Sequence, residues 1–293
     1  MSENLQQKMP TYDDWLREAT RFLQQHDITS ARLDAELILA HTIRKQRTYL
    51  HAHGDEVLSD RHAEIARARL ELRSHNTPIA YIIGHKEFYG RIFKTTPAAL
   101  IPRPESESII KLLQDIISHD KSLNLQNTHL IDVGTGTGCL GITAKLEWPW
   151  IDVTLIDNSS HALNLAKQNA TLLKANVNTI KNNLLGGYGM PVDIIIANLP
   201  YVDHSWEVSP DTQAEPPEAL YAKEGGLQLI FRLLDQAALL LRTGGYVLIE
   251  SDPRQQNAII RHSESLQLNH VQTEGFITVF SLSQSQDKTP RSQ

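Results

Sequence analysis

The sequence predicts an α/β protein with a mostly parallel sheet, preceded by a small helical domain. Between His129 and Leu282, short apolar stretches alternate with stretches long enough to form helices. This alternation is typical of a parallel sheet covered by helices on both faces. Before residue 75, apolar residues recur at helical spacing, and no glycine occurs from Met1 to His53. We therefore expect a helical bundle followed by a larger α/β domain.

The helical domain is predicted to span residues 1–75. Thr11 and Asp14 have the spacing of a helix-capping box, and apolar residues follow on one face. A second helix is centred on Leu33–Ile38, and Ser59 is the expected cap of a third, longer one.

The composition changes at Asn76, where the chain becomes rich in aromatic residues, glycine and proline. Residues 76–104 are predicted to connect the two domains, with a hairpin at Phe88–Phe93 and an extended loop at Ile101–Pro104. The α/β domain is expected over 105–283, and the polar tail 284–293 is predicted to be disordered.

Within the α/β domain, the apolar stretches predict five strands and the amphipathic stretches four helices. The expected strands are His129–Val133, Val153–Ile156, Asp193–Ala197, Tyr246–Glu250 and Phe276–Leu282. The expected helices are Ile109–Ile117, Leu140–Leu146, Ala162–Leu173 and Leu227–Leu241.

Composition narrows the function classes. The 293 residues are 41% hydrophobic and 21% charged, as in ordinary globular proteins. No apolar run of about 18 residues is present, so we expect no membrane partner. The net charge of −6 argues against broad affinity for nucleic acid, so no stable nucleic-acid binding is expected.

Cysteine and histidine usage adds two expectations. The single cysteine, Cys139, and the polar start of the chain indicate a reducing, cytoplasmic setting. Thirteen histidines occur, but His51 and His53 are the closest pair and no ligand cluster follows them. We therefore expect no metal site.

A glycine-rich loop follows the first predicted strand of the α/β domain. The stretch Asp132–Gly138, Asp-Val-Gly-Thr-Gly-Thr-Gly, lets the backbone approach a ligand closely and take positive φ. Ligands bind at such strand ends in open parallel sheets. Gly136, Gly138 and Gly141 also satisfy the dinucleotide fingerprint, so the loop alone leaves S-adenosylmethionine, a dinucleotide and a structural turn open.

Two acidic residues accompany the loop. Asp157 ends the next predicted strand at the distance expected for a carboxylate that binds a ribose. Asp132, at the start of the loop, suits the cationic amino-acid end of S-adenosylmethionine. The residues after Asp157 are expected to cap a helix.

The strand Val192–Ala197 ends in the tetrapeptide Asn198-Leu199-Pro200-Tyr201. A planar amide or amino nitrogen is a weak nucleophile because its lone pair is delocalised. The Asn198 side-chain carbonyl and the Leu199 main-chain carbonyl are suited to accept hydrogen bonds from such a group. Tyr201 offers an aromatic face for packing. The tetrapeptide thus predicts methyl transfer to a planar nitrogen, although Asn and Pro also favour ordinary turns.

With both motifs, the chain resembles the protein-(glutamine-N5) methyltransferases that modify peptide chain release factors. The resemblance covers nearly the whole chain. Besides the motifs above, it is carried by Tyr81-x-x-Gly84-x-x-x-Phe88-x-Gly90, Leu100-Ile101-Pro102-Arg103-Pro104-Glu105 and Glu215-Pro216-x-x-Ala219-Leu220.

The resemblance implies a Rossmann-like, seven-stranded class I methyltransferase sheet and an N-terminal helical domain that engages the protein substrate. It implies S-adenosylmethionine as cofactor and the glutamine of a Gly-Gly-Gln motif in release factors as methyl acceptor, a role in translation termination. The implied cofactor-binding residues are Asp132, Gly134, Thr135, Gly136, Thr137, Gly138, Asp157, Asn183, Leu184 and Asn198. The implied acceptor-binding, catalytic residues are Asn198, Leu199, Pro200 and Tyr201, with Arg103 and Glu107 as looser candidates.

The sequence departs from the family pattern at three places. Leu199 replaces the first proline of Asn-Pro-Pro-Tyr, which keeps the carbonyl but loses the fixed φ of proline. Asn182 or Asn183 stands where the family has an acidic residue, and Ser106-Glu107 where it more often has Thr-Glu. An adenine-N6 nucleic-acid methyltransferase, a methyltransferase of a ribosomal-protein glutamine and a non-catalytic binding module remain alternatives.

Overall fold

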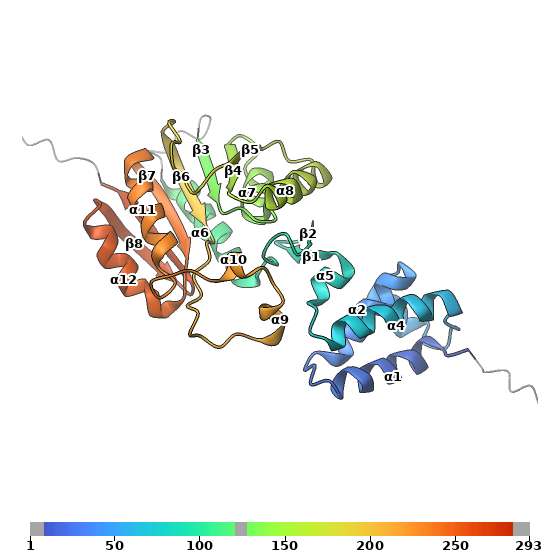
Figure 1. The fold of residues 1–293 in the computed structure, drawn as a ribbon. Helices are drawn as coiled ribbons and strands as arrows, with labels where there is room; N and C mark the ends of the chain where they lie inside the picture. The colour runs from blue at the N-terminus through green and yellow to red at the C-terminus, as the bar shows by residue number, and fades with distance from the viewer. Residues whose placement is uncertain (1–8, 121–127, 284–293) are drawn as a thin grey trace, which may run out of the picture. The chain divides into compact units, whose positions relative to one another are not determined.

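The chain divides into two compact units. The computed structural model describes residues 9–120 and 128–283, so the predicted tail 284–293 lies outside the described residues. One unit comprises Met1–His85 together with Val208–Ala214, and the other comprises Lys86–Glu207 together with Glu215–Gln293. Figure 1 shows residues 9–85 of the first unit in blue to teal and the seven-stranded sheet of the second in green to red. The predicted connector 76–104 is divided between the two units.

The first unit is helical. Its helices are α1 (Tyr12–Gln24), α2 (Ala31–Ile43), α3 (Arg47–Ala52), α4 (Asp60–Ser74), α5 (Ile79–Ile83) and the short α9 (Pro210–Gln213). The capping box predicted at Thr11 and Asp14 is present, and the Ser59 side chain caps α4. Buried leucine, isoleucine and alanine side chains of α1, α2 and α4 form its core.

Arg73 lies inside the helical unit as a buried cation with two partners. Its Nε donates to Asp34 Oδ2 at 2.7 Å, and Nη1 and Nη2 donate to the Asp211 carboxylate at 2.8 and 2.9 Å. The Arg73 and Asp34 side chains are only 4% and 3% exposed. The pair therefore binds α4 to α2, and Asp211 adds the segment Val208–Ala214 to the same cluster.

The second unit contains a seven-stranded sheet in the order β5-β4-β3-β6-β7-β9-β8. The strands are β3 (His129–Val133), β4 (Asp152–Asp157), β5 (Asn178–Lys181), β6 (Val192–Ala197), β7 (Leu241–Glu250), β8 (Leu268–Glu274) and β9 (Ile277–Leu282). The pairs from β5 to β7 are parallel, and β9 is antiparallel to both of its neighbours. The prediction of a mostly parallel, seven-stranded sheet is confirmed.

Helices cover the two faces of this sheet. They are α6 (Glu107–His119), α7 (Cys139–Glu147), α8 (Ser160–Leu173), α10 (Pro217–Leu220), α11 (Gln228–Leu240) and α12 (Pro253–Glu264). Buried side chains of α6, α7 and α8 pack in one apolar cluster, and those of α11 and α12 in another. Successive residues of β3, Leu130 and Ile131, belong to different clusters, as expected for a strand buried on both faces.

The predicted hairpin is present as β1 (His85–Phe88) and β2 (Arg91–Lys94), followed by a 3-10 turn at Pro104–Ser106. The sequence missed β5 and β8, which lie at the two edges of the sheet. Both are largely exposed, so they lack the apolar pattern that identifies central strands. It also missed α3, α5, α9, α10 and α12. No helix among the described residues is both long and apolar enough to span a membrane.

The topology brings four strand ends together. The chain leaves β3 toward one edge of the sheet to form β4, and later returns to the other side of β3 to form β6. Such a reversal leaves a crevice at the carboxyl ends of the strands, which is where open α/β sheets bind ligands. The glycine loop, Asp157, Asn198 and Glu250 all lie at or directly after these ends.

Arg73→Met should destabilise the helical unit by about 3–5 kcal/mol, because it leaves Asp34 as a buried charge without its cation. The measurement is denaturant unfolding combined with hydrogen exchange of α2 and α4. Arg17→Met is the control, because both Arg17 and its partner Asp14 are exposed. Equal unfolding midpoints for the two variants would contradict a structural role for Arg73.

Candidate active site

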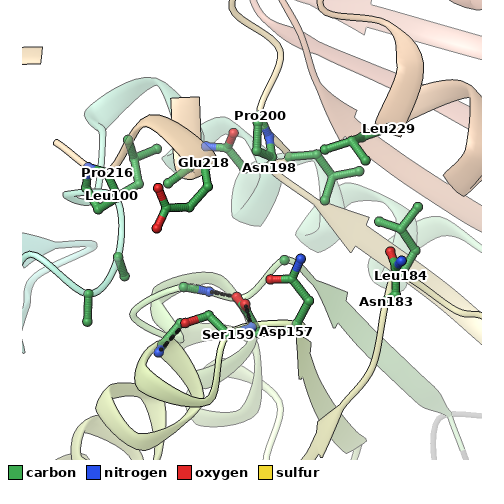
Figure 2. Close-up of a pocket in the computed structure, with 18 of the residues that line it drawn as sticks. Leu100, Asp157, Ser159, Asn183, Leu184, Asn198, Pro200, Pro216, Glu218 and Leu229 are labelled. Carbon is green, nitrogen blue, oxygen red and sulfur yellow. Dashed lines mark hydrogen bonds between the residues drawn. The ribbon is translucent and has the colours of Figure 1, made fainter. Parts of the chain in front are cut away.

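A cavity opens at the carboxyl ends of β3, β4 and β6. Its empty volume is about 790 Å³, including space open to solvent, which is within the usual range of about 300–1,000 Å³ for small-molecule sites. The lining comes from five stretches of the second unit: Ala98–Leu100, Gly134 with Gly136, Asp157–Ser159 with Ala162, Asn182–Leu184 and Asn198–Pro200, joined by Pro216, Glu218, Ala219 and Leu229. Figure 2 shows Asp157 and Asn198 on opposite sides of this cavity.

The glycine loop lies directly against the tetrapeptide loop. Gly134 has φ +70°, and a Cβ atom there would lie 2.7 Å from Leu199 Cδ2, closer than real Cβ atoms approach. Its N–H donates to the Ile156 carbonyl oxygen at 2.8 Å, which fixes the loop over β4. The absent side chain at Gly134 thus allows the two loops that the sequence singled out to line one cavity.

Asp157 enters the cavity from the end of β4. Its Oδ2 accepts from the Gly136 N–H at 2.9 Å and its Oδ1 from the Ser159 N–H at 2.8 Å. Burial raises the pKa of this carboxyl, and the backbone hydrogen bonds lower it in part. Each oxygen retains acceptor capacity, so the half-buried side chain is held in place with room for further donors.

Asn183 and Leu184 line the end of the cavity near Leu229, as Figure 2 shows. Leu184 is buried and has φ +55°, an uncommon conformation for a leucine. The Asn182 side chain supports this turn, since Oδ1 accepts from the Asn183 N–H at 2.9 Å and Nδ2 donates to the Gly186 carbonyl oxygen at 2.8 Å. The turn therefore presents an apolar side chain to the cavity.

Asp132 lies beneath the glycine loop and is not part of the lining. Its Oδ2 accepts from Thr135 Oγ1 at 2.6 Å and from the Gly141 N–H at 2.9 Å, so it ties the loop to the start of α7. Burial raises its pKa to about 6, against the opposing effect of both hydrogen bonds. The structure thus gives this residue a role within the loop, and contact with the cofactor stays a prediction.

Three other predicted cofactor residues, Thr135, Thr137 and Gly138, are also buried in the loop rather than in the lining. The Thr137 carbonyl oxygen accepts from Asn169 Nδ2 at 2.9 Å. The cavity itself is lined by the other six residues of the predicted set: Gly134, Gly136, Asp157, Asn183, Leu184 and Asn198.

Three residues of the tetrapeptide line the cavity, and the fourth lies outside the lining. Asn198, Leu199 and Pro200 line the cavity, with the Leu199 side chain buried against the glycine loop. Tyr201 is outside the lining, and its hydroxyl donates to Glu250 Oε1 at 3.2 Å. Gln255 Nε2 donates to the Tyr201 carbonyl oxygen at 2.8 Å, which anchors this end of the loop.

The sequence missed two polar residues beside Asn198. Asn198 Nδ2 donates to Ser106 Oγ at 3.0 Å, and Ser106 Oγ donates to Glu250 Oε2 at 2.5 Å. Burial raises the pKa of Glu250, and the hydrogen bonds from Ser106 and Tyr201 lower it in part. An acidic residue at the carboxyl end of the predicted strand Tyr246–Glu250 was the signal that could have identified it.

Glu215 connects two further stretches of the resemblance. It is 3% exposed, and its Oε2 accepts from the Ile101 N–H at 2.9 Å. Its Oε1 pairs with the Arg103 guanidinium. The Ile-Pro-Arg-Pro-Glu loop and the Glu-Pro segment are therefore held together, with Leu100 and Pro216 in the cavity lining. Glu107, the other looser candidate, accepts from the Tyr89 N–H at 2.9 Å.

Asp157→Ala should weaken cofactor binding, because it removes the carboxylate that enters the cavity from the end of β4. We expect the dissociation constant to rise about tenfold or more, as for loss of a hydrogen bond to a charged group. Calorimetry with S-adenosylmethionine measures it. Asp152→Ala, at the opposite end of β4, is the control, and an unchanged constant in Asp157→Ala would remove this residue from the site.

Asp132→Asn should remove a pH dependence of stability. Since the folded chain holds this proton to about pH 6 and an ordinary aspartate to 3.8, ionisation costs the fold free energy as pH rises between these values. A pKa difference of about two corresponds to about 3 kcal/mol. Because a part of this difference is already present at pH 4, the wild type should lose about 2 kcal/mol of unfolding free energy between about pH 4 and pH 7, relative to Asp132→Asn. Urea unfolding of both proteins at both pH values tests this. If the difference in unfolding free energy between wild type and variant is the same at both pH values, the prediction is wrong.

Solved structures share the fold at low identity. The hMettl16 catalytic domain, solved in complex with a 3′UTR hairpin, has a TM-score of 0.52 and 14% identity, over 98% of this chain and 96% of that one. A 16S rRNA methyltransferase from Thermus thermophilus (RsmC), solved in complex with AdoMet and guanosine, has a TM-score of 0.50 and 14% identity, over 68% and 50%. These likenesses establish the fold class.

Sequence relatives are closer. The family described as PrmC N-terminal domain matches residues 14–84, and the methyltransferase small domain matches residues 111–229. A release factor glutamine methyltransferase of Koribacter versatilis is 36% identical, over 79% of this chain and 83% of the relative. The protein of that name from Escherichia coli (strain K12) is 31% identical, over 85% and 88%. At this identity and coverage, the chain belongs to the release factor glutamine methyltransferase family.

Proposed function

We propose that the protein transfers a methyl group from S-adenosylmethionine to the side-chain amide nitrogen (N5) of the glutamine in the Gly-Gly-Gln motif of peptide chain release factors. The observation that carries this proposal is the single cavity lined by Asp157 on one side and Asn198 on the other. One side suits a nucleoside, and the other suits an amide whose N–H groups need acceptors.

The lining fits the proposed cofactor. Asp157 would hold the ribose hydroxyls, Leu184 and Leu229 would pack against the adenine, and the backbone at Gly134 and Gly136 would face the methionine part. A Cβ at Gly134 would overlap Leu199, so this position must be glycine. The absence of a side chain there also leaves the backbone open to close approach by a ligand. When bound, S-adenosylmethionine supplies an electrophilic methyl group on a positively charged sulfur. Family membership supports this cofactor over the dinucleotide that the glycine motif left open.

The acceptor side works by hydrogen bonding. The Asn198 Oδ1 and the Leu199 carbonyl oxygen would accept from the two N–H groups of the glutamine amide. That grip favours the geometry in which the nitrogen lone pair points at the methyl group rather than into its own carbonyl. Leu199, which is buried, and Pro200, which is half-buried, would shield the nitrogen from water. No strong base is needed before transfer, and the extra proton on nitrogen leaves to solvent afterwards.

The other parts of the proposal follow from the two units. The helical unit would engage the release factor, and its match to the PrmC N-terminal domain family over residues 14–84 supports this role. The net charge of −6 supports a protein rather than a nucleic-acid substrate. With the single cysteine, we place the activity in the cytoplasm, during translation termination.

The test is mass spectrometry of the Gly-Gly-Gln peptide after incubation of the release factor with the protein and S-adenosylmethionine. We expect one added methyl group on the glutamine. A release factor with that glutamine replaced by glutamate is the matched control. Adenine-containing DNA and RNA and a ribosomal protein are parallel arms. Methylation in one of those arms, without methylation of the release factor, would overturn the proposal.

Asn198→Ala should lower kcat at least about 100-fold and leave the dissociation constant of S-adenosylmethionine near the wild-type value. The reason is that the side-chain carbonyl acts mainly on the transition state, like one donor of an oxyanion hole. Single-turnover kinetics and calorimetry measure the two quantities. Asn178→Ala, on the exposed edge strand β5, is the control. Wild-type turnover in Asn198→Ala would show that the acceptor site lies elsewhere.

A further inference from the structure

We infer that Ser106 and Glu250 fix the orientation of the Asn198 side-chain amide, so that its oxygen rather than its nitrogen faces the acceptor. Both act through Asn198 and are positioning residues. Their role in catalysis rests on the proposed function. The orientation of the amide is a property of the protein alone and can be measured independently.

The three side chains form one hydrogen-bonded row. Asn198 follows β6 and Glu250 ends β7, and these strands pair side by side with Ala197 opposite Ile249. Ser106 reaches them from the end of the 3-10 turn that precedes α6. Asn198 Nδ2 lies 3.0 Å from Ser106 Oγ, which lies 2.5 Å from Glu250 Oε2. Ser106 and Glu250 are 2% and 1% exposed, so water does not compete for these bonds.

The direction of each bond follows from the last member of the row. Both carboxylate oxygens of Glu250 accept, one from Ser106 and one from Tyr201, so the Ser106 hydroxyl donates its one proton to Glu250. The Ser106 oxygen can then only accept from Asn198, which must present its NH₂ group. The Tyr201 hydroxyl donates to the other oxygen of Glu250 at 3.2 Å, which adds a second donor to the charged form. Within the described residues, no other hydrogen bond is made by the Asn198 side chain, so Oδ1 is left for the cavity that Asn198 lines.

This orientation matters because the two ends of an amide have nearly the same size and shape. Only hydrogen bonds distinguish them. In the reversed orientation, Asn198 would direct its own N–H groups at the N–H groups of the substrate amide. The substrate would then lose a hydrogen-bond acceptor, and donors would face donors. The buried row therefore selects the state of Asn198 that can grip a substrate amide.

Glu250→Gln, Ser106→Ala and the double variant test the row. Glu250→Gln is close in shape to the neutral acid and can donate to Ser106, so the direction is no longer imposed. Each single variant should lower kcat about 10- to 100-fold, as expected for a misplaced reacting group. The dissociation constant of S-adenosylmethionine should change little. Because both residues act through the same bond, the double variant should be no slower than the slower single variant. Ser106→Thr keeps the hydroxyl and should recover most of the activity.

Two control variants make the same chemical changes elsewhere in the second unit. Ser263→Ala removes a buried hydroxyl from α12, and Asp193→Asn changes a carboxylate at the opposite end of β6. Both should keep the wild-type kcat. A second measurement follows the side-chain amide protons of Asn198 by nitrogen-15 NMR. In the wild type, one proton should exchange slowly because it is donated to Ser106, and Ser106→Ala should abolish this protection.

The outcomes separate the inference from the function on which it rests. A wild type that never methylates a release factor overturns the proposed function, while the NMR measurement still reports the amide orientation. Unchanged Asn198 amide protons in Ser106→Ala overturn the inference. A wild-type kcat in both single variants would also overturn the inference, as would a double variant in which the two losses of kcat add. The same holds if the loss of kcat is accompanied by loss of thermal stability and of cofactor binding.

Discussion

The site depends on the contact between two loops that follow neighbouring parallel strands. Gly134, after β3, and Leu199, after β6, come together so closely that a side chain on the glycine would overlap the leucine. Because β3 and β6 are paired in register, this contact fixes the position of the glycine loop relative to the tetrapeptide loop across the cavity. Methyl transfer from an activated donor is mainly a matter of such positioning, since proximity and desolvation supply most of the effect.

Buried charges maintain the irregular backbone around this contact. Glu215 satisfies the Ile101 N–H and pairs with Arg103, and Asp132 satisfies the Gly141 N–H beneath the glycine loop. Buried polar groups are costly unless they are paired, so each of these residues stabilises one particular loop conformation strongly.

Glu250 is another buried acid beside the cavity. It is a buried acid whose two oxygens receive the Ser106 and Tyr201 hydroxyls, and through Ser106 it reaches Asn198. Because this carboxylate accepts all of its hydrogen bonds, it determines which atom donates at each step of the row. A neutral amide in its place could either donate or accept. In the proposed arrangement the acid does not react: it sets the orientation of Asn198, and Asn198 would contact the acceptor.

The sequence by itself determined the α/β class, the central strands β3, β4, β6, β7 and β9, and the two loops of the site, because buried parallel strands carry long apolar stretches and their ends carry polar motifs. It missed the exposed edge strands β5 and β8, where no apolar pattern exists. Only the tertiary structure decided that Asp132 supports the glycine loop, that Ser106 and Glu250 form a hydrogen-bonded row with Asn198, and that Glu215 joins Ile101 and Arg103. The pairings of Ser106 with Glu250 and of Glu215 with Ile101 join residues more than 100 positions apart, and local sequence carries no record of such pairings.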